Sequence, residues 1–352
     1  MKQKRQVFRL TATALIAILS VACSSEPDAI DASQSQPPNS RKPNDGSLND
    51  DSQSKPAEKE LNSTETSCDQ SPLAARTTLD VQYKNTVGVD KNLQSLDLYM
   101  PEVKNPCAGV PVVAWVHGGA WMIGDKSQIG FKAQYFNSMG YGFVSINYRL
   151  SPNLLKDIQP LQDSVKFPDH PSDVGAALGW IHKNILTHGG DPNKLALLGH
   201  SAGAHLAALV ALDQTYIKDS NSSWNPQSLR CVGSYDTEAY DVTAAIQSAS
   251  QQQQQLYINA FGILQVQWTK ASPITHVKEL ALPFQLALRG DIQRQEILQE
   301  FKAALERKNN KTEVINAQEL THEEVGRVIG SPADQVMTPA VTQFIRKTCF
   351  DP

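Results

Sequence analysis

The sequence contains no apolar run of the length that a membrane-spanning helix needs, which is roughly 20 residues. The apolar stretch near the N-terminus, Leu10–Leu19, is about half that long. The overall composition, with 40% hydrophobic and 19% charged residues, is ordinary for a globular protein. After its N-terminal segments, the chain is long enough for one large domain with a full core.

An excess of positive charge is also lacking. The chain has 32 Lys and Arg against 36 Asp and Glu, for a net charge of −4. The first 22 residues carry four basic residues and no acid, so the chain from Cys23 onward has a net charge of −8. A mildly acidic chain gives no support for nucleic-acid binding, and we expect no nucleic-acid partner.

Cysteine is scarce, with five residues in 352, and none of them lies in a nucleophile motif. The eight histidines are scattered, and no Cys/His pair has the spacing of a metal-binding motif. The sequence therefore predicts neither a catalytic cysteine nor a metal site.

The N-terminus has the pattern of an export signal. Four basic residues within the first nine precede the apolar segment Leu10–Leu19, which ends in the small residues of Ser20–Ala22 before Cys23. This pattern resembles a bacterial lipoprotein signal, in which the cysteine thiol is diacylated and the cysteine becomes the new N-terminus. One departure is Ser20 at the position where such signals usually carry Leu. The resemblance implies an envelope protein anchored by lipid to a membrane, on the periplasmic or outer-membrane side. The alternative is an ordinary cleaved signal with Cys23 incidental.

Four cysteines remain if Cys23 is lipidated, and an even number in an exported chain suggests disulfides. Of the three pairings that four cysteines allow, we favour Cys68–Cys107 and Cys231–Cys349. The first would fix the entry to the domain, and the second would fix its C-terminal helix. Buried free thiols are the alternative.

Three segments follow from these patterns: a signal peptide at 1–22, a polar tether at 23–70 and a catalytic domain at 71–352. Residues 24–67 contain no aromatic residue and are rich in Ser, Pro, Asn, Asp, Gln and Lys. Such a segment buries too little apolar surface to offset its conformational entropy, so we expect a disordered spacer.

Short apolar runs alternate with helical patterns through the predicted domain, which indicates an α/β fold with a mostly parallel, doubly wound sheet flanked by helices. Residues 214–275 are the least regular part, and the run Gln251–Gln255 is expected to be a solvated stretch of an insertion or cap. The predicted strands are Leu96–Met100, Val110–Val116, Tyr141–Tyr148, Leu195–Leu198, Arg230–Ser234, Pro283–Leu288 and Thr312–Ile315. The predicted helices are 172–182 with Ser172 as its cap, Ala202–Leu212, Arg294–Arg307 and Pro339–Lys347.

The strongest chemical signal is Gly199-His-Ser-Ala-Gly203, between a predicted strand and a predicted helix. This context is typical of a nucleophile elbow, in which a sharp turn lifts the serine above the sheet. The two glycines relieve crowding at the turn. We therefore predict Ser201 as the nucleophile and the Ala202 amide as a donor to an oxyanion.

A glycine-rich loop, His117-Gly-Gly-Ala-Trp121, follows the apolar strand Val110–Val116. Loops of this kind supply further oxyanion donors through backbone amides, and we name Gly118 and Gly119. The side chain of His117 is expected to support the loop.

His322 is the predicted general base, because it follows the last predicted strand and the other histidines precede the region where a base is expected. The acid is predicted to be Asp291, in the loop after Pro283–Leu288. Asp236, after the strand Arg230–Ser234, is the second candidate. A dyad without a carboxylate is the third.

These motifs together resemble α/β-hydrolase esterases of the carboxylesterase, hormone-sensitive-lipase-like and arylformamidase-like groups, from about Leu96 to Phe350. The resemblance implies the α/β-hydrolase fold, a small-molecule acyl ester as substrate and no cofactor. In many relatives the acid stands three residues after the glycine at 290, where this chain has Gln293. The matching stretches are His117–Lys126, Ser145–Leu150, Asp173–Trp180, His188–Pro192, Gly199–His205 and His322–Glu324.

The predicted function is hydrolysis of carboxylic esters through an acyl-enzyme on Ser201. One alternative is an amidase or peptidase of the same fold. The other is a non-catalytic, lipid-tethered binding domain, although such proteins usually lose the nucleophile or the base.

Overall fold

The structure is a computed structural model, and it describes residues 71–154 and 164–350. The predicted signal peptide and the whole of the predicted tether, with the predicted lipidation site Cys23, lie outside these residues. No helix in the described part is both long and apolar enough to cross a membrane.

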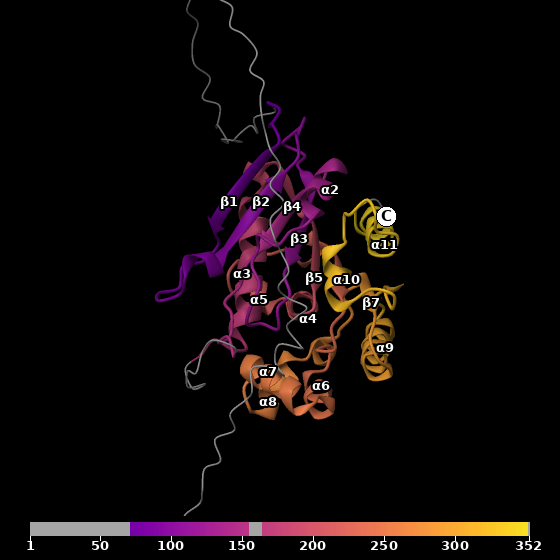
Figure 1. The fold of residues 1–352 in the computed structure, drawn as a ribbon. Helices are drawn as coiled ribbons and strands as arrows, with labels where there is room; N and C mark the ends of the chain where they lie inside the picture. The colour runs from indigo at the N-terminus through magenta and orange to yellow at the C-terminus, as the bar shows by residue number, and fades with distance from the viewer. Residues whose placement is uncertain (1–70, 155–163, 351–352) are drawn as a thin grey trace, which may run out of the picture.

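A single eight-stranded sheet forms the centre of the domain (Figure 1). Its strand order is β1-β2-β4-β3-β5-β6-β7-β8. β2 pairs antiparallel with both β1 and β4, and every pairing from β4 through β8 is parallel. The prediction of a mostly parallel sheet of the α/β-hydrolase type is confirmed. The strands are β1 (Arg76–Gln82), β2 (Ser95–Met100), β3 (Val110–Val116), β4 (Gly142–Ile146), β5 (Gly190–His200), β6 (Leu229–Tyr235), β7 (Phe284–Leu288) and β8 (Thr312–Asn316).

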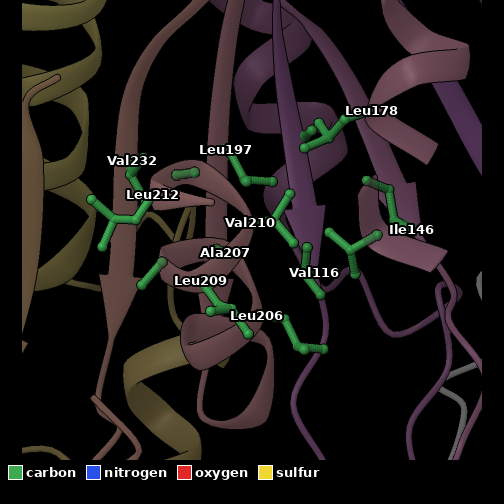
Figure 2. Packing of buried hydrophobic residues seen from close by; sticks show 14 of the residues in the cluster. Val116, Ile146, Leu178, Leu197, Leu206, Ala207, Leu209, Val210, Leu212 and Val232 are labelled. Atoms are coloured by element: carbon green, nitrogen blue, oxygen red, sulfur yellow. The ribbon is translucent and has the colours of Figure 1, made fainter. Parts of the chain in front are cut away.

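Helices cover both faces of the sheet. Successive residues of the buried strands point to opposite sides, so both faces carry apolar side chains that helices can bury. In β3, Val112 and Ala114 belong to one apolar cluster, and Val113 and Trp115 belong to the other. Figure 2 shows the first cluster, in which leucines of α4 lie against β3, β5 and β6. The longer helices are α2 (Lys132–Ser138), α3 (Asp169–Asn184), α4 (Ala202–Leu212), α6 (Val242–Ser248), α7 (Gln251–Phe261), α8 (Gln265–Ala271), α9 (Ile292–Arg307), α10 (His322–Arg327) and α11 (Met337–Phe344). Shorter turns are α5 (Thr215–Lys218), η1 (Lys91–Gln94), η3 (Ile185–His188), η4 (Pro226–Ser228), η5 (Pro273–His276) and η6 (Ile345–Phe350).

The region between β6 and β7 is more regular than the sequence predicts. Gln251–Gln255 is largely exposed, as expected for a solvated stretch, and these residues form the start of α7. Ser250 and Gln253 form a capping box there, which satisfies the amides at the start of the helix. Helices α6, α7 and α8 lie together at one end of the sheet (Figure 1).

A second difference concerns α3. The helix begins at Asp169 and not after Ser172, so the prediction of Ser172 as its cap is wrong. The hydroxyl of Ser172 donates to the carbonyl of Pro168 instead.

One of the two predicted disulfides is confirmed. Cys231 of β6 is bonded to Cys349 of η6, which ties the C-terminal turn to a central strand across 118 residues of sequence. Cys107 is also disulfide-bonded. Its predicted partner, Cys68, lies outside the described residues, so that pairing stays a prediction.

Candidate active site

Ser201 stands in the sharp turn between β5 and α4, with φ +56° and ψ −122°. A side chain in this left-handed region is strained, and such strain is typical of a functional position. Neighbouring glycines make the turn sterically allowed. A Cβ on Gly199 would lie 2.3 Å from the Gly203 carbonyl oxygen, and one on Gly203 would lie 2.1 Å from the Val116 oxygen. The elbow therefore needs glycine at both positions.

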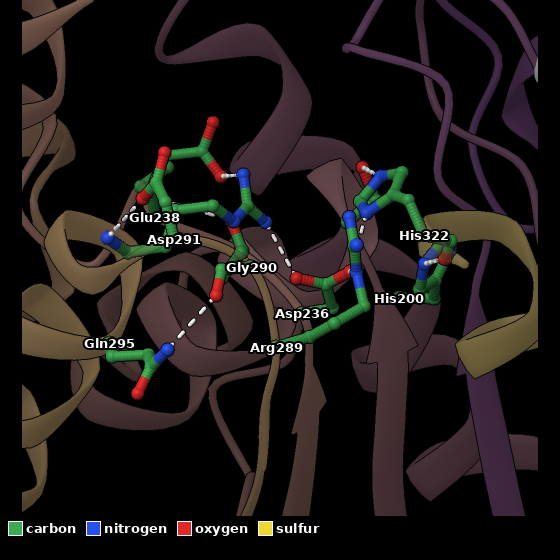
Figure 3. A network of polar contacts seen from close by, with 12 residues as sticks. His200, Asp236, Glu238, Arg289, Gly290, Asp291, Gln295 and His322 are labelled. Atoms are coloured by element: carbon green, nitrogen blue, oxygen red, sulfur yellow. Dashed lines mark hydrogen bonds and ion pairs between the residues drawn. The ribbon is translucent and has the colours of Figure 1, made fainter. Parts of the chain in front are cut away.

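Three side chains form a continuous hydrogen-bonded row, and Figure 3 labels two of them, His322 and Asp236. The Ser201 hydroxyl donates to Nε2 of His322 at 2.9 Å, and Nδ1 of His322 donates to Oδ2 of Asp236 at 2.6 Å. The three residues come from the loops after β5, β6 and β8. Because the carboxyl ends of parallel strands meet at one edge of a sheet, these loops converge. The structure thus brings together Ser201 and His322 as predicted.

The acid in this row is Asp236, so the prediction of Asp291 is corrected. Asp291 is the N-cap of α9, where its carboxylate accepts from the Arg294 amide at 3.0 Å. Asp236 follows directly after β6 and has φ +57°, which turns it toward the neighbouring strand end. The amide of Ser201 donates to the carbonyl of Tyr235, so the turns after β5 and β6 are joined beside the acid.

Two arginines, which the sequence analysis did not identify, also bind Asp236 (Figure 3). Nε of Arg289 donates to Oδ2 at 2.6 Å, and Nη2 of Arg294 donates to Oδ1 at 2.6 Å. Burial alone would raise the pKa of Asp236. The hydrogen bond from His322 and the charge of Arg294 outweigh that effect and lower the pKa well below its usual range. Asp236 is therefore ionised and fixed in orientation.

This ion-pair network extends to α7. Arg294 also donates to Glu238, and the Tyr257 hydroxyl donates to Oε1 of Glu238 at 2.5 Å. Tyr257 lies on α7, so the helix that lines the cavity is joined to the acid through two intervening side chains. No local sequence pattern marks these residues, because they come from three separated segments.

The predicted oxyanion donors Gly118, Gly119 and Ala202 line the same cavity as Ser201. A Cβ on Gly118 would lie 3.1 Å from the Ser201 Cβ, so this part of the loop runs directly past the nucleophile. Gly119 has φ +112°, a conformation that favours glycine. Among the residues that the structure describes, no carbonyl or side chain accepts from the amides of Gly118, Gly119 or Ala202. These amides are thus free to bind a developing oxyanion.

Buried histidines support the turns around Ser201. His117 stacks on Tyr148, with 4.5 Å between ring centroids, and burial lowers its pKa. His200 donates from Nε2 to the carbonyl of His322 at 2.6 Å, which joins the elbow to the start of α10. Burial, followed by the neighbouring His322, lowers the pKa of His200 to about 3. Both histidines are therefore neutral supports and not additional bases.

Three ligand-type atoms, from His200, Asp236 and His322, lie within 4.8 Å of one another. Distance alone would allow a metal ion there. However, Nε2 of His200 faces the His322 carbonyl, and both nitrogens of the His322 ring already have partners in the row. The donor set therefore fits proton transfer better than metal binding.

A cavity of about 720 Å³ opens over Ser201. This volume falls in the range of small-molecule sites. Its walls include the loop 117–124, α7 and α10. Ser201 and His322 line the same space as the apolar and aromatic side chains of Trp121, Leu256 and Tyr257. The site can therefore hold an organic molecule of moderate size beside the nucleophile.

Comparison with known proteins places the chain in a family. The BD-FAE family model matches residues 96–294, which is more than half of the sequence. The chain belongs to the BD-FAE family. The matched region includes the elbow, the oxyanion loop and Asp236, and it ends before His322.

Curated relatives of this BD-FAE protein carry esterase names. A probable isoprenylcysteine alpha-carbonyl methylesterase of Arabidopsis thaliana is 34% identical over 144 residues, or 40% of this chain and 27% of that protein. Esterase LipQ of Mycobacterium tuberculosis is 37% identical over 118 residues, or 33% of this chain and 25% of that protein. The chain thus spans about a quarter of the length of these relatives.

Solved structures share the fold at low identity. Thermogutta terrifontis esterase 2 phosphonylated by sarin superposes with a TM-score of 0.60 at 18% identity, over 79% of this chain and 96% of that one. A truncated carbohydrate esterase from gut microbiota gives 0.59 at 16% identity, over 78% and 97%. At these identities the likeness concerns the fold alone.

Proposed function

We propose that the protein is a carboxylic ester hydrolase that acts through an acyl-enzyme on Ser201. The observation that carries this proposal is the row Ser201–His322–Asp236, which combines a nucleophile, a base and an orienting acid in hydrogen-bonding contact. Membership of the BD-FAE family and the esterase names of the relatives support an ester as substrate.

The mechanism follows from the geometry. Ser201 attacks the ester carbonyl while Nε2 of His322 takes the hydroxyl proton. The amides of Gly118, Gly119 and Ala202 bind the oxyanion of the tetrahedral intermediate, where one such donor typically contributes about 10²–10³ in rate. His322 then protonates the leaving alcohol as the carbon–oxygen bond breaks. Water, deprotonated by the same histidine, attacks the acyl-enzyme, and the carboxylic acid leaves with Ser201 restored.

Asp236 has an electrostatic role in this scheme. Its carboxylate holds the proton of His322 on Nδ1, which leaves Nε2 free to accept from Ser201. The same charge stabilises the imidazolium that forms during each proton transfer. Arg289 and Arg294 keep the carboxylate ionised and in place.

Parallel assays separate this proposal from its alternatives. We expect the chain from residue 24 onward to hydrolyse p-nitrophenyl butyrate, and we expect Ser201→Ala to remove that turnover. The matched p-nitroanilide of butyric acid tests the amidase alternative. Faster cleavage of the anilide than of the ester would overturn the choice of substrate. A folded parent protein that cleaves neither substrate, across acetyl to octanoyl groups, would favour a binding domain.

We also propose that Cys23 carries a lipid anchor that tethers the domain to a bacterial envelope membrane. The basis is the pattern before Cys23 in the sequence, where a basic segment and a short apolar segment precede small residues. Lipid chains contribute about 0.8 kcal/mol per buried methylene, so several chains give firm attachment. Metabolic labelling with a palmitate analogue tests this proposal. Labelling of the parent but not of Cys23→Ser supports the anchor, and an unlabelled parent contradicts it.

A further inference from the structure

Lys132, the first residue of α2, is a buried lysine in the wall of the catalytic cavity. Only 2% of its surface is exposed. Its Nζ makes one long hydrogen bond, to the carbonyl of Ile129 at 3.4 Å. In the part of the chain that the structure describes, no carboxylate lies within 4.0 Å of this ammonium group. The proposed mechanism gives Lys132 no role.

Lys132 differs in this respect from the other cations around the cavity. Arg289 and Arg294 are paired with Asp236, and Arg327 lies 3.7 Å from Glu324. Among the described residues that line the cavity, Lys132 is therefore the one cation without a carboxylate partner.

A buried ammonium without a counter-ion is unfavourable, because the interior does not replace its hydration. Burial accordingly lowers the pKa of Lys132 to about 7. The ring of Trp115, whose centroid is 4.5 Å from Nζ, provides a cation–π contact that offsets part of this cost. An anion bound in the cavity would offset the rest. Below this pKa, Lys132 is a cation without a carboxylate partner among the described residues, and an anionic ligand in the cavity would supply one.

The position of Lys132 indicates which part of an ester would meet it. Lys132 follows Gly130 by two residues, and a Cβ on Gly130 would lie 3.4 Å from the carbonyl oxygen of Arg327, the last residue of α10. Lys132 and Gly326 of α10 both line the cavity. A Cβ on Gly326 would lie 2.6 Å from Cγ of His200, so this wall closes against the residue before the nucleophile. α10 begins at His322, and the leaving alcohol has to approach Nε2 of His322 to receive its proton. The alcohol part of the substrate therefore lies toward the α10 wall and Lys132.

We propose that Lys132 binds a carboxylate on the alcohol part of the ester. The preferred substrates are then hydroxy acids whose hydroxyl group is acylated and whose carboxylate is free. The inference rests on the proposed ester hydrolase function and adds a substrate class to it. Trp115 forms an apolar side to this subsite, which suits an alcohol that carries its carboxylate on a ring or a short chain. The ammonium group supplies a point charge and three donors to the carboxylate oxygens.

The test compares charged and neutral esters of one acid: the butyrates of 3- and 4-hydroxybenzoate against those of the matching hydroxybenzamides. At pH 6 we expect the parent enzyme to have a higher kcat/KM for the carboxylate ester than for the amide-bearing ester, for at least one ring position. The ratio of these two kcat/KM values measures the preference. Lys132→Met should lower this ratio by about tenfold or more and change turnover of the neutral esters less than threefold. Lys302→Met, which removes a partly exposed lysine of α9 outside the cavity, is the charge-matched control and should keep the parent ratio.

Equal ratios in the parent and Lys132→Met would overturn the subsite. The parent alone gives a second test that does not depend on the folding of the variant, through inhibition of neutral-ester hydrolysis by the free alcohols. Hydroxybenzoates should inhibit more strongly than the hydroxybenzamides, and equal or weaker inhibition contradicts the proposal. Failure of the parent to cleave the neutral esters would instead contradict the proposed function, so the two failures are distinguishable.

Discussion

Asp236 and His322 are joined by a hydrogen bond of 2.6 Å, and the carboxylate that accepts it is held by two guanidinium groups as well. Asp236 therefore has little freedom to rotate away from the imidazole. The positive charges also keep it ionised while His322 gains and loses a proton.

The identity of the acid can be measured with two matched substitutions. We expect Asp236→Asn to lower kcat by roughly 10³–10⁴, because the amide no longer holds the correct tautomer of His322 or stabilises its charged form. Asp291→Asn should leave kcat within about twofold, because Asn caps a helix about as well as Asp. Steady-state kinetics with p-nitrophenyl butyrate measures both. A larger loss in Asp291→Asn would show that the assignment of the acid is wrong.

The pH dependence of kcat should report one proton on its acidic side. The pKa of Asp236 lies well below its usual range, so its carboxylate stays ionised over the acidic side of the profile and adds no second proton there. Log kcat should therefore rise with a slope of one below the optimum. A slope of two between pH 5 and the optimum would mean that a second group has to ionise.

The same carboxylate links stability to pH. Because the pKa of Asp236 is lowered by folding, its stabilising contribution is fully present above its unfolded value of about 3.9 and is lost as the pH falls toward the folded value. The melting temperature should consequently decline below about pH 4. Thermal unfolding between pH 3 and 8 measures this trend, and a constant melting temperature down to pH 3 would contradict it.

Gly119 in the oxyanion loop is expected to be intolerant of a side chain. A Cβ there would lie 2.0 Å from the carbonyl oxygen of Ile123, so Gly119→Ala has to move the loop. We expect kcat to fall by about 10²–10³ as an oxyanion donor is displaced. Gly140→Ala is the control, because Gly140 has φ +80° but no atom within 4 Å of the added Cβ. Similar activity in the two variants would argue against the loop as an oxyanion site.

The disulfide between Cys231 and Cys349 should contribute to stability and not to turnover. Replacing both cysteines with Ala should lower the free energy of unfolding by about 2–4 kcal/mol, because the unfolded chain gains freedom. Cys231 lies five residues before Asp236 along an extended strand, or about 16 Å away, so kcat should change less than twofold. Chemical denaturation and ester hydrolysis measure these effects. Unchanged stability would mean that local contacts hold η6 in place without the bond.

Local patterns predicted the elements whose ends are marked by strong signals. Val110–Val116 and Ala202–Leu212 were predicted with the bounds that the structure has, because a glycine-rich loop and the elbow terminate them. Ser201 and His322 were found for a related reason. The elbow is a local motif, and the base follows the last strand of the fold.

Asp236 was ranked only second as the acid, because the choice depends on which strand ends meet in three dimensions. Asp236 and Asp291 both follow a strand, so their order along the chain does not distinguish them. One available signal was the position of Asp291 immediately before the helical run that starts at Ile292, where an aspartate is typical of an N-cap. The capping box of Ser250 and Gln253 was a similar signal that Gln251–Gln255 is helical. Lys132 has no such signal, because its burial arises from tertiary packing that includes the ring of Trp115.

The most direct test of the central claim is labelling of the protein with a fluorophosphonate, followed by mass spectrometry of its peptides. We expect one adduct per chain, on Ser201, with loss of ester hydrolysis in proportion to labelling. Labelling should be absent in Ser201→Ala and much slower in Asp236→Asn, because Asp236 acts through His322 to activate the serine. An adduct on another residue, or full hydrolytic activity after Ser201 is labelled, would contradict the account.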